Sequence, residues 1–136
     1  MRIVQPEGWP RPRGYSNAIA AEGRFLFISG QVGWDEQEQF VSDDLVAQVR
    51  QALHNVRAVL AAAGARPEHV ARMTWYVLDK REYARRAAEV GAVYRELMGK
   101  HFPAMSMVQV AALMEDRAKV EIESTAVIPV ESGTID

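Results

Sequence analysis

The sequence contains no cysteine, which excludes disulfide bonds, thiolate metal sites and cysteine nucleophiles. Histidine is also scarce, and His54, His69 and His101 stand far apart along the chain. None of them has the H-x-x-x-H or comparable spacing with which a helix or loop presents metal ligands. We therefore expect no metal site and no cofactor.

The sequence also lacks an excess of positive charge, and it lacks long apolar runs. The formal net charge is −2, so no overall positive field attracts a phosphate backbone. No stretch approaches the roughly 18 uninterrupted apolar residues of a membrane span. Pro6, Pro10 and Pro12 occupy the region where a signal peptide needs an apolar segment. We expect a soluble, cytoplasmic protein with neither nucleic acid nor a membrane as its partner.

The motifs of common catalytic and nucleotide-binding sites are absent too. The chain has no G-x-S-x-G segment and no P-loop, and residues 30–33 lack the third glycine of a dinucleotide-binding fingerprint. Ser29 has no histidine near it in the sequence, which disfavours a serine nucleophile.

The residues that are present have the composition of one ordinary folded domain. Of the 136 residues, 49% are apolar and 25% are charged, and this length suits a single domain. Residues 1–13 are rich in proline and predict an irregular arm, with a short strand over residues 2–4. Residues 129–136 predict a polar tail. The whole chain, 1–136, is therefore interpreted as one domain.

A long amphipathic helix is the strongest local pattern. Apolar residues recur every three or four positions from Leu45 to Leu60, which predicts one buried stripe. Ser42 is the candidate N-cap, and Gly64 is the candidate C-terminal stop. The opposite face, which includes Gln48, is expected to face solvent.

Residues 79–83 are expected to lead into a second helix, whose apolar stripe runs from Ala84 and ends at Gly99. Small residues at positions 87, 88, 91 and 92 are expected to let it pack closely on a sheet. Gly91 costs roughly 1 kcal/mol relative to alanine inside a helix, so a packing or pocket role is expected for it.

Alternation of side chains with a period of two predicts the strands. The first two are expected to form a hairpin through Gly23. The order of strands and helices predicts an α+β fold in which two helices cover one face of a mixed sheet. The predicted strands are 15–19, 24–32, 69–78, 102–110 and 119–128.

The strand over 102–110 is predicted to be central, because apolar or small residues stand on both of its faces. Met105 and Met107 share one face, while Ala104 and Val108 share the other. Two helices leave one sheet face uncovered, so we expect this face to bind a second copy of the chain.

Few polar residues are candidates for chemistry. Glu121 and Glu123 share a strand face, where they are either solvent-facing or directed into a pocket between subunits. A carboxylate in such a pocket can act as a general acid or base on water. Gly30 indicates a bulge, a close approach or a simple bend, and Tyr15 is either a core residue or a pocket wall.

The order of several segments resembles the Rid (YjgF) family, also called endoribonuclease L-PSP-like proteins. This resemblance implies a chorismate-mutase-like α+β domain that assembles as a homotrimer, with small-molecule clefts between neighbouring subunits. The matching segments are GYSNAI (14–19), FLFISGQV (25–32), VAQVRQALHNVRAVLAAAG (46–64), PAMSMVQV (103–110) and KVEIESTAV (119–127), together with Asp79 and Tyr83.

The resemblance also implies an activity and a set of site residues. Members of the family hydrolyse reactive enamines and imines, such as 2-aminoacrylate, to 2-keto acids and ammonia. By position, Glu121 corresponds to the glutamate that positions or activates water. The residues expected to line the ligand site are Tyr15, Ser29, Gly30, Gly91, Met105 and Met107.

Met105 departs from the family pattern. In the deaminases this position is an arginine that binds the substrate carboxylate through charge-assisted hydrogen bonds, whereas methionine offers dispersion and a weak sulfur acceptor. An α-imino acid is expected to bind poorly unless another cation, such as Arg13, reaches the site. Otherwise an apolar, roomier pocket is expected, suited to a larger or uncharged ligand.

Three functional hypotheses follow. The first is a hydrolase acting on a C=N bond of a non-standard substrate, with Glu121 as acid and base. The second is a trimer that binds a small molecule without catalysis, in a regulatory role. The third, ribonuclease activity, is the least favoured because of the acidic charge balance and the absence of a histidine pair.

Overall fold

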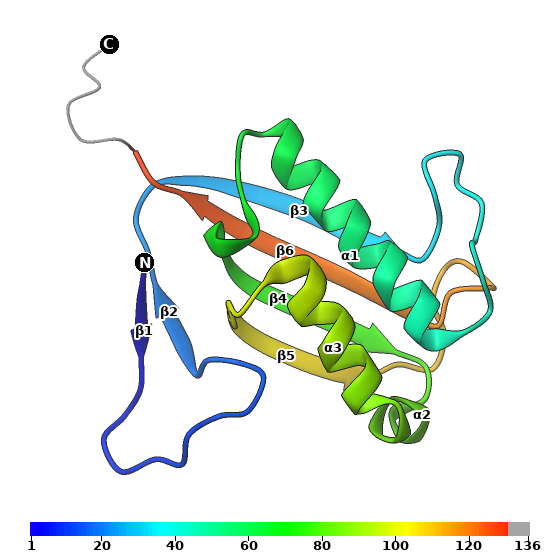
Figure 1. Cartoon of the computed structure of the whole chain (residues 1–136), viewed down its shortest axis with the longest axis horizontal. Helices are drawn as coiled ribbons and strands as arrows, with labels where there is room; N and C mark the ends of the chain where they lie inside the picture. The colour runs from blue at the N-terminus through cyan, green and yellow to red at the C-terminus, as the bar shows by residue number, and fades with distance from the viewer. Residues whose placement is uncertain (131–136) are drawn as a thin grey trace.

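A four-stranded mixed sheet forms the centre of the molecule in the computed structural model, which describes residues 1–130. Its strands are β3 (Arg24–Val32), β4 (Val70–Val77), β5 (Ala104–Gln109) and β6 (Val120–Ile128). The helices are α1 (Leu45–Ala62), the 3₁₀ helix η1 (Pro67–His69), α2 (Lys80–Arg85) and α3 (Ala87–Met98). Two short strands, β1 (Arg2–Val4) and β2 (Ala18–Ala20), form a separate ribbon (Figure 1).

The order of strands in the sheet is β3-β6-β4-β5. β6 pairs antiparallel with both β3 and β4, whereas β4 and β5 are parallel. A parallel pair needs a long crossover connection, and α2 and α3 provide it (Figure 1). The prediction of a central position for residues 102–110 was wrong, because β5 is an edge strand of this sheet. Its alternating pattern reflects one face beneath α3 and one exposed face that carries Val108.

The hairpin predicted between residues 15–19 and 24–32 was also wrong. β2 pairs with β1, and β3 pairs along its length with β6. Gly23 separates β2 from β3, with a φ of 147°, and a Cβ there would lie 2.8 Å from the carbonyl carbon of Ile128. The chain therefore passes beside the end of β6 between β2 and β3, and these two strands do not pair with each other.

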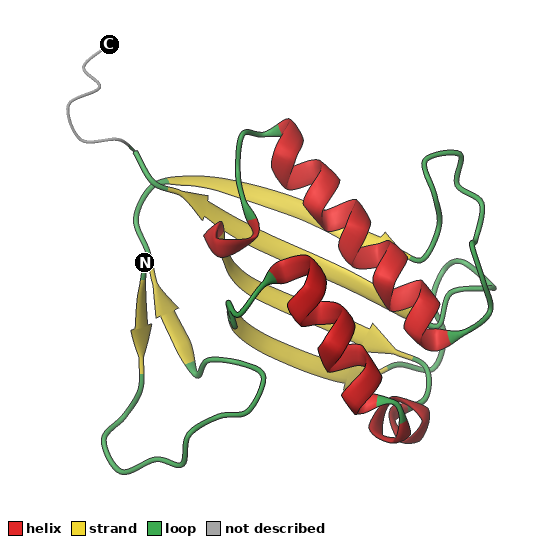
Figure 2. Ribbon diagram, viewed as in Figure 1, coloured by secondary structure: helices red, strands yellow, loops and turns green. Residues whose placement is uncertain are grey.

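Both long helices cover the same face of the sheet and pack against each other (Figure 2). The core between helices and sheet includes Leu53 and Val56 of α1, Trp75 of β4 and Ile122 of β6, each at most 2% exposed. The α+β class with two main helices on one face of a mixed sheet is therefore confirmed.

The start of α1 differs from the prediction. Asp44 is the N-cap, and its carboxylate accepts a hydrogen bond from the Ala47 N–H at 3.0 Å. Ser42 lies two residues earlier, and its hydroxyl accepts a hydrogen bond from the Asp44 N–H. At the other end, Gly64 follows the helix with a φ of 73°, so the predicted C-terminal stop is confirmed.

Gln48, which was expected to face solvent, is fully buried. Its amide nitrogen donates to the carbonyls of Ser42 and Arg117, and its oxygen accepts from the Lys119 N–H. The hydrogen bonds with Arg117 and Lys119 tie α1 to the loop that precedes β6, and the one with Ser42 joins α1 to the segment before it. A helical wheel cannot show this contact, because the loop comes from about seventy residues further along the chain.

The predicted second helix is divided at Arg86 into α2 and α3. Its buried side chains are large, with Val90, Val93, Tyr94, Leu97 and Met98 facing the core. Ala88 and Ala92 are exposed, and Gly91 is half-buried, so the small residues do not bring this helix onto the sheet. In the N-terminal arm, the short strand predicted over residues 2–4 is confirmed as β1. Of the tail predicted over 129–136, positions 131–136 lie outside the described residues.

Candidate functional site

A pocket of about 320 Å³ lies between α3 and the edge of the sheet. Gly91 comes from α3, whereas Met105 and Met107 come from the face of β5 that is turned toward that helix. The register pairs Met105 with Met73 and Met107 with Trp75, which are both buried under the helices. Three residues predicted from the sequence to bind a ligand therefore line one cavity.

Gly91 keeps this cavity open. A Cβ at position 91 would meet only one atom within 4 Å, the Arg95 Nη1 at 3.3 Å. The glycine thus leaves space in the wall of the pocket, and the guanidinium of Arg95 extends beside that space. Arg95 was missed by the sequence reasoning, although its spacing of four residues from Gly91 places both on one helical face.

Aromatic residues close the deep side of the pocket. Trp75 is 2% exposed, and its indole N–H has no acceptor among residues 1–130. Tyr94 donates its hydroxyl proton to the His101 carbonyl at 2.7 Å and stacks on Phe102. Burial raises the pKa of the Tyr94 hydroxyl, so this group remains protonated as a hydrogen-bond donor at neutral pH.

The N-terminal arm forms a second, wider hollow of about 1160 Å³ next to this pocket. Tyr15 lines the wide hollow and is 40% exposed, but it does not line the pocket under α3. Arg13 lines both cavities. The arm is held at β5 by Ser16, whose N–H donates to the Pro103 carbonyl at 3.0 Å and whose hydroxyl donates to the Phe102 carbonyl at 2.5 Å.

The remaining predicted residues lie on β3 and β6. The pairing of these strands shifts register between Ile28 and Gln31, so Ser29 and Gly30 form a bulge. A Cβ on Gly30 would lie 2.6 Å from the carboxyl carbon of Glu121. Glu121 therefore extends across the bulge, and the missing side chain at position 30 leaves room for its carboxylate.

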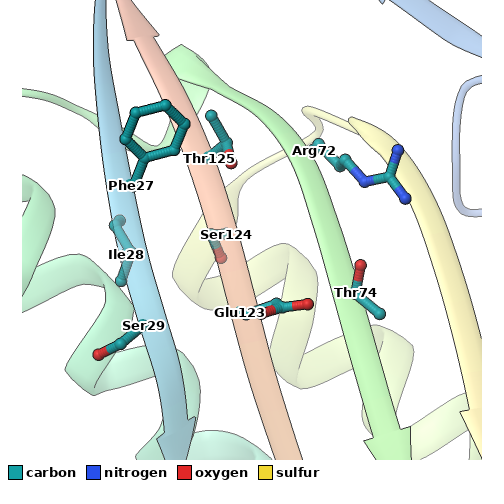
Figure 3. Close-up of a pocket in the computed structure, with 8 residues that line it drawn as sticks. All are labelled: Phe27, Ile28, Ser29, Arg72, Thr74, Glu123, Ser124 and Thr125. Atoms are coloured by element: carbon teal, nitrogen blue, oxygen red, sulfur yellow. The ribbon is translucent and has the colours of Figure 1, made fainter.

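A shallow hollow of about 330 Å³ on the uncovered face of the sheet includes Ser29. In Figure 3, the carboxylate of Glu123 extends from β6 toward Thr74 on β4. Glu123 accepts a hydrogen bond from the Tyr76 hydroxyl at 2.5 Å, which raises the pKa of that hydroxyl. The uncovered face is thus polar over β4 and β6, and its large exposed apolar residues there are Phe25 and Phe27 on β3 and Val108 on β5.

The candidate residues form two groups on opposite faces of the sheet. Trp75 is the register partner of both Met107 and Ile122, and these side chains lie on the helix-covered face. Glu121 is the neighbour of Ile122 in β6, so it points to the uncovered face. One chain brings together Gly91, Met105 and Met107, and separately brings Gly30 to Glu121, but the sheet separates the two groups.

No group of three or more histidine or acidic side chains in residues 1–130 is arranged to hold a metal ion. Among the helices of the same residues, none is long and apolar enough to span a membrane.

This geometry defines a class of protein. It is a small α+β domain with a pocket at the edge of its sheet and a carboxylate beside a glycine bulge on the opposite face. The chain belongs to the Rid (YjgF) family, since the endoribonuclease L-PSP family model matches residues 10–128.

Individual relatives agree with this assignment. The RutC family protein PH0854 of Pyrococcus horikoshii is 38% identical over 126 residues, which cover 91% of this chain and 95% of the relative. The 2-iminobutanoate/2-iminopropanoate deaminase of Salmonella typhimurium is 38% identical over 108 residues, 77% of this chain and 80% of the relative. A crystal structure of the Rid family protein YyfB from Yersinia pestis, 35% identical, has a TM-score of 0.83 and covers 93% of this chain and 98% of that chain.

Proposed function

We propose that the protein is a homotrimeric hydrolase of imine or enamine substrates, with active sites in clefts between subunits. The observation that carries this proposal is the separation of the candidate residues. Met105 and Glu121 lie on opposite faces of one sheet, so one chain cannot present both to a single ligand. A second copy that places its Glu121 beside the pocket under α3 completes a site with both groups. The cytoplasmic location expected from the sequence is part of this proposal.

The chemistry requires one carboxylate and one water molecule. In its charged form, Glu121 accepts a proton from water while the water oxygen attacks the carbon of the C=N bond. The nitrogen takes up a proton, and a carbinolamine forms. The C–N bond of this intermediate then breaks, ammonia leaves and a C=O bond forms, so imine and water give a carbonyl compound and ammonia. An enamine enters the same sequence after tautomerising to the imine.

The names of two relatives support this reaction. The matched proteins of Salmonella typhimurium and Escherichia coli K12 are 2-iminobutanoate/2-iminopropanoate deaminases, at 38% and 37% identity. The space beside Gly30 into which Glu121 extends also supports a defined position for that carboxylate.

The test is ammonia release from 2-iminopropanoate generated in situ, measured for the wild type and for Glu121→Gln. We expect turnover in the wild type and a loss of about 100-fold or more in the variant, the usual contribution of a general acid or base. Glu123→Gln is the matched control, because this neighbouring acid shares the strand face and is hydrogen-bonded to Tyr76. Turnover that is unchanged in Glu121→Gln, or that appears only in Met105→Arg, contradicts the proposal.

The second candidate is a trimer that binds a small molecule without turning it over. Met105 favours it, because a thioether cannot replace the charge-assisted hydrogen bonds of an arginine. Native mass spectrometry of the purified protein tests this alternative. A bound molecule of defined mass, together with no ammonia release from the wild type, favours binding alone.

A further inference from the structure

We propose that the pocket under α3 selects anionic molecules with an apolar body, and that Arg13 and Arg95 together bind the anionic group. This inference deepens the proposed function, since it takes the same pocket as the substrate site. Met105 supplies no positive charge to the pocket, and the inference assigns this charge to Arg13 and Arg95, which lie outside β5.

The charge of the pocket is the first observation. Arg13 and Arg95 both contribute to its lining, and no aspartate or glutamate does. Both arginines thus belong to a pocket lining that contains no acidic side chain, and the Arg95 guanidinium lies beside the space at Gly91. Arginine binds carboxylates through paired, charge-assisted hydrogen bonds, and its charge persists across the whole physiological pH range.

Arg95 has no acidic partner on its own helix. The positions three and four residues away are Gly91, Ala92, Met98 and Gly99, and none of these can pair with a cation. The adjacent Glu96 points elsewhere, because it pairs with Arg50 of α1 at 2.5 Å. No salt bridge involves Arg95 in residues 1–130, although Arg86 at the start of the same helix pairs with both Asp44 and Glu89.

Arg13 reaches the pocket from the arm. The backbone of Gly14, the next residue, has a φ of 77°, a conformation that glycine adopts without strain. Ser16 then fixes the chain to the start of β5 through its two hydrogen bonds to the carbonyls of Phe102 and Pro103. Arg13 thus lies three residues from a firm anchor, and it has no salt bridge within the described chain.

Burial separates the charged rim of the pocket from its apolar floor. Arg13 and Arg95 are exposed, Met105 and Met107 are half-buried, and Trp75 is 2% exposed. A ligand that satisfies both regions carries its anionic group at the rim and an alkyl or aryl group over the methionines. The volume of about 320 Å³ lies at the small end of ligand sites, which fits an acid with a branched alkyl or single-ring side chain.

The experiment compares two stable probes, 4-methyl-2-oxopentanoate and its uncharged methyl ester, by ligand-observed NMR titration. These molecules share the apolar body and differ in the anionic group. We expect the wild type to bind the acid about 10-fold or more tightly than the ester. Arg13→Gln and Arg95→Gln are each expected to weaken binding of the acid by roughly 10-fold, and to leave binding of the ester unchanged. Arg57→Gln, an exposed arginine of α1 outside the pocket, is the matched control.

Equal binding of acid and ester by the wild type overturns the inference, and so does unchanged binding of the acid by both variants. The side chains replaced are exposed, and circular dichroism of each variant verifies that the fold is retained. Because binding is measured without turnover, the two proposals fail separately. If the wild type prefers the acid but releases no ammonia, this inference is supported and the proposed hydrolase activity is contradicted. If the wild type releases ammonia but binds acid and ester equally, the hydrolase activity is supported and this inference is contradicted.

Discussion

Single residues without side chains shape both halves of the candidate site. Gly91 leaves open the wall beside Arg95, where an added Cβ would make one tight contact with a flexible guanidinium. Gly30 instead faces the carboxylate, carboxyl carbon and Cγ of Glu121. The two glycines therefore have different roles, since Gly91 supplies volume to a pocket and Gly30 leaves room for the Glu121 carboxylate.

Replacement of Gly30 by alanine is expected to displace the Glu121 carboxylate while the sheet stays intact. The clash involves the end of a flexible side chain, so we expect little change in the unfolding midpoint. Ammonia release is expected to fall by about 10-fold or more, because small displacements of a catalytic group are costly. Gly91→Ala serves as comparison: it is expected to stabilise α3 by up to about 1 kcal/mol, measured by urea unfolding. Full turnover in Gly30→Ala would show that the position of Glu121 is not critical.

At the scale of elements, local patterns predicted most of the secondary structure but not its pairing. The periods of α1 and of the four long strands lie in consecutive residues, so these elements were confirmed at nearly the predicted bounds. The strand predicted over 15–19 is shorter and lies later, at Ala18–Ala20. The partner of β2, the edge position of β5 and the burial of Gln48 depend on segments far away in the sequence. No local pattern contains that information.

The residues of the candidate site, like the elements of the fold, could be predicted only in part from the sequence. The resemblance located Gly91, Met105 and Met107, and the structure brings these residues to one pocket. Tyr15 lies in the neighbouring hollow instead, because Ser16 fixes the arm at the start of β5. In the sequence, only the spacing of four residues from Gly91 indicated that Arg95 lies at the pocket. Exposed arginines are common on helices, so this spacing alone did not predict a site residue.

Asp44, the N-cap of α1, makes the stability of this helix dependent on pH. Hydrogen bonds from Arg86 and from the Ala47 N–H lower the pKa of Asp44 below its ordinary value of 3.8. A lowered pKa in the folded state means that the charged form stabilises the fold. This contribution is complete above pH 3.8, and it is lost as the pH falls through the lowered value.

We therefore expect Asp44→Ala to reduce the free energy of unfolding at pH 7 by about 1 kcal/mol, measured by urea denaturation. Asp44→Asn retains a capping oxygen but no charge, so it is expected to lose less stability at neutral pH and to show a weaker pH dependence in acid. Equal losses for both variants at every pH would assign the effect to the salt bridge with Arg86 rather than to the cap.

The uncovered face of the sheet is the surface through which we expect copies of the whole molecule to assemble. Phe25 and Phe27 are 60% and 75% exposed, and their rings contact each other edge to face. They lie next to the bulge that positions Glu121, so a subunit that covers them also approaches this carboxylate. The polar residues of β4 and β6 limit the apolar area, which makes this phenylalanine pair the expected centre of the contact.

Phe27→Glu is expected to convert the proposed trimer into monomers at roughly micromolar concentration, because it places a charge in an apolar contact. Size-exclusion chromatography with light scattering measures the mass, and ammonia release is expected to disappear in parallel. Met114→Glu is the matched control, since Met114 is 94% exposed in the loop between β5 and β6. A wild type that is a stable monomer at this concentration contradicts the assembly, and so does a Phe27→Glu variant with the wild-type mass.

In the proposed site, the residue of the arm that selects the ligand, Arg13, lies apart from the residues that stabilise the fold. Arg13 belongs to a segment outside the layers of helices and sheet, joined to them at Ser16, whereas the core that stabilises the domain lies between α1, α3 and the sheet. Substitutions in the arm can change the charge presented to the pocket at little cost in stability. Mutation and selection can then redirect this scaffold toward new molecules while its folding margin is preserved.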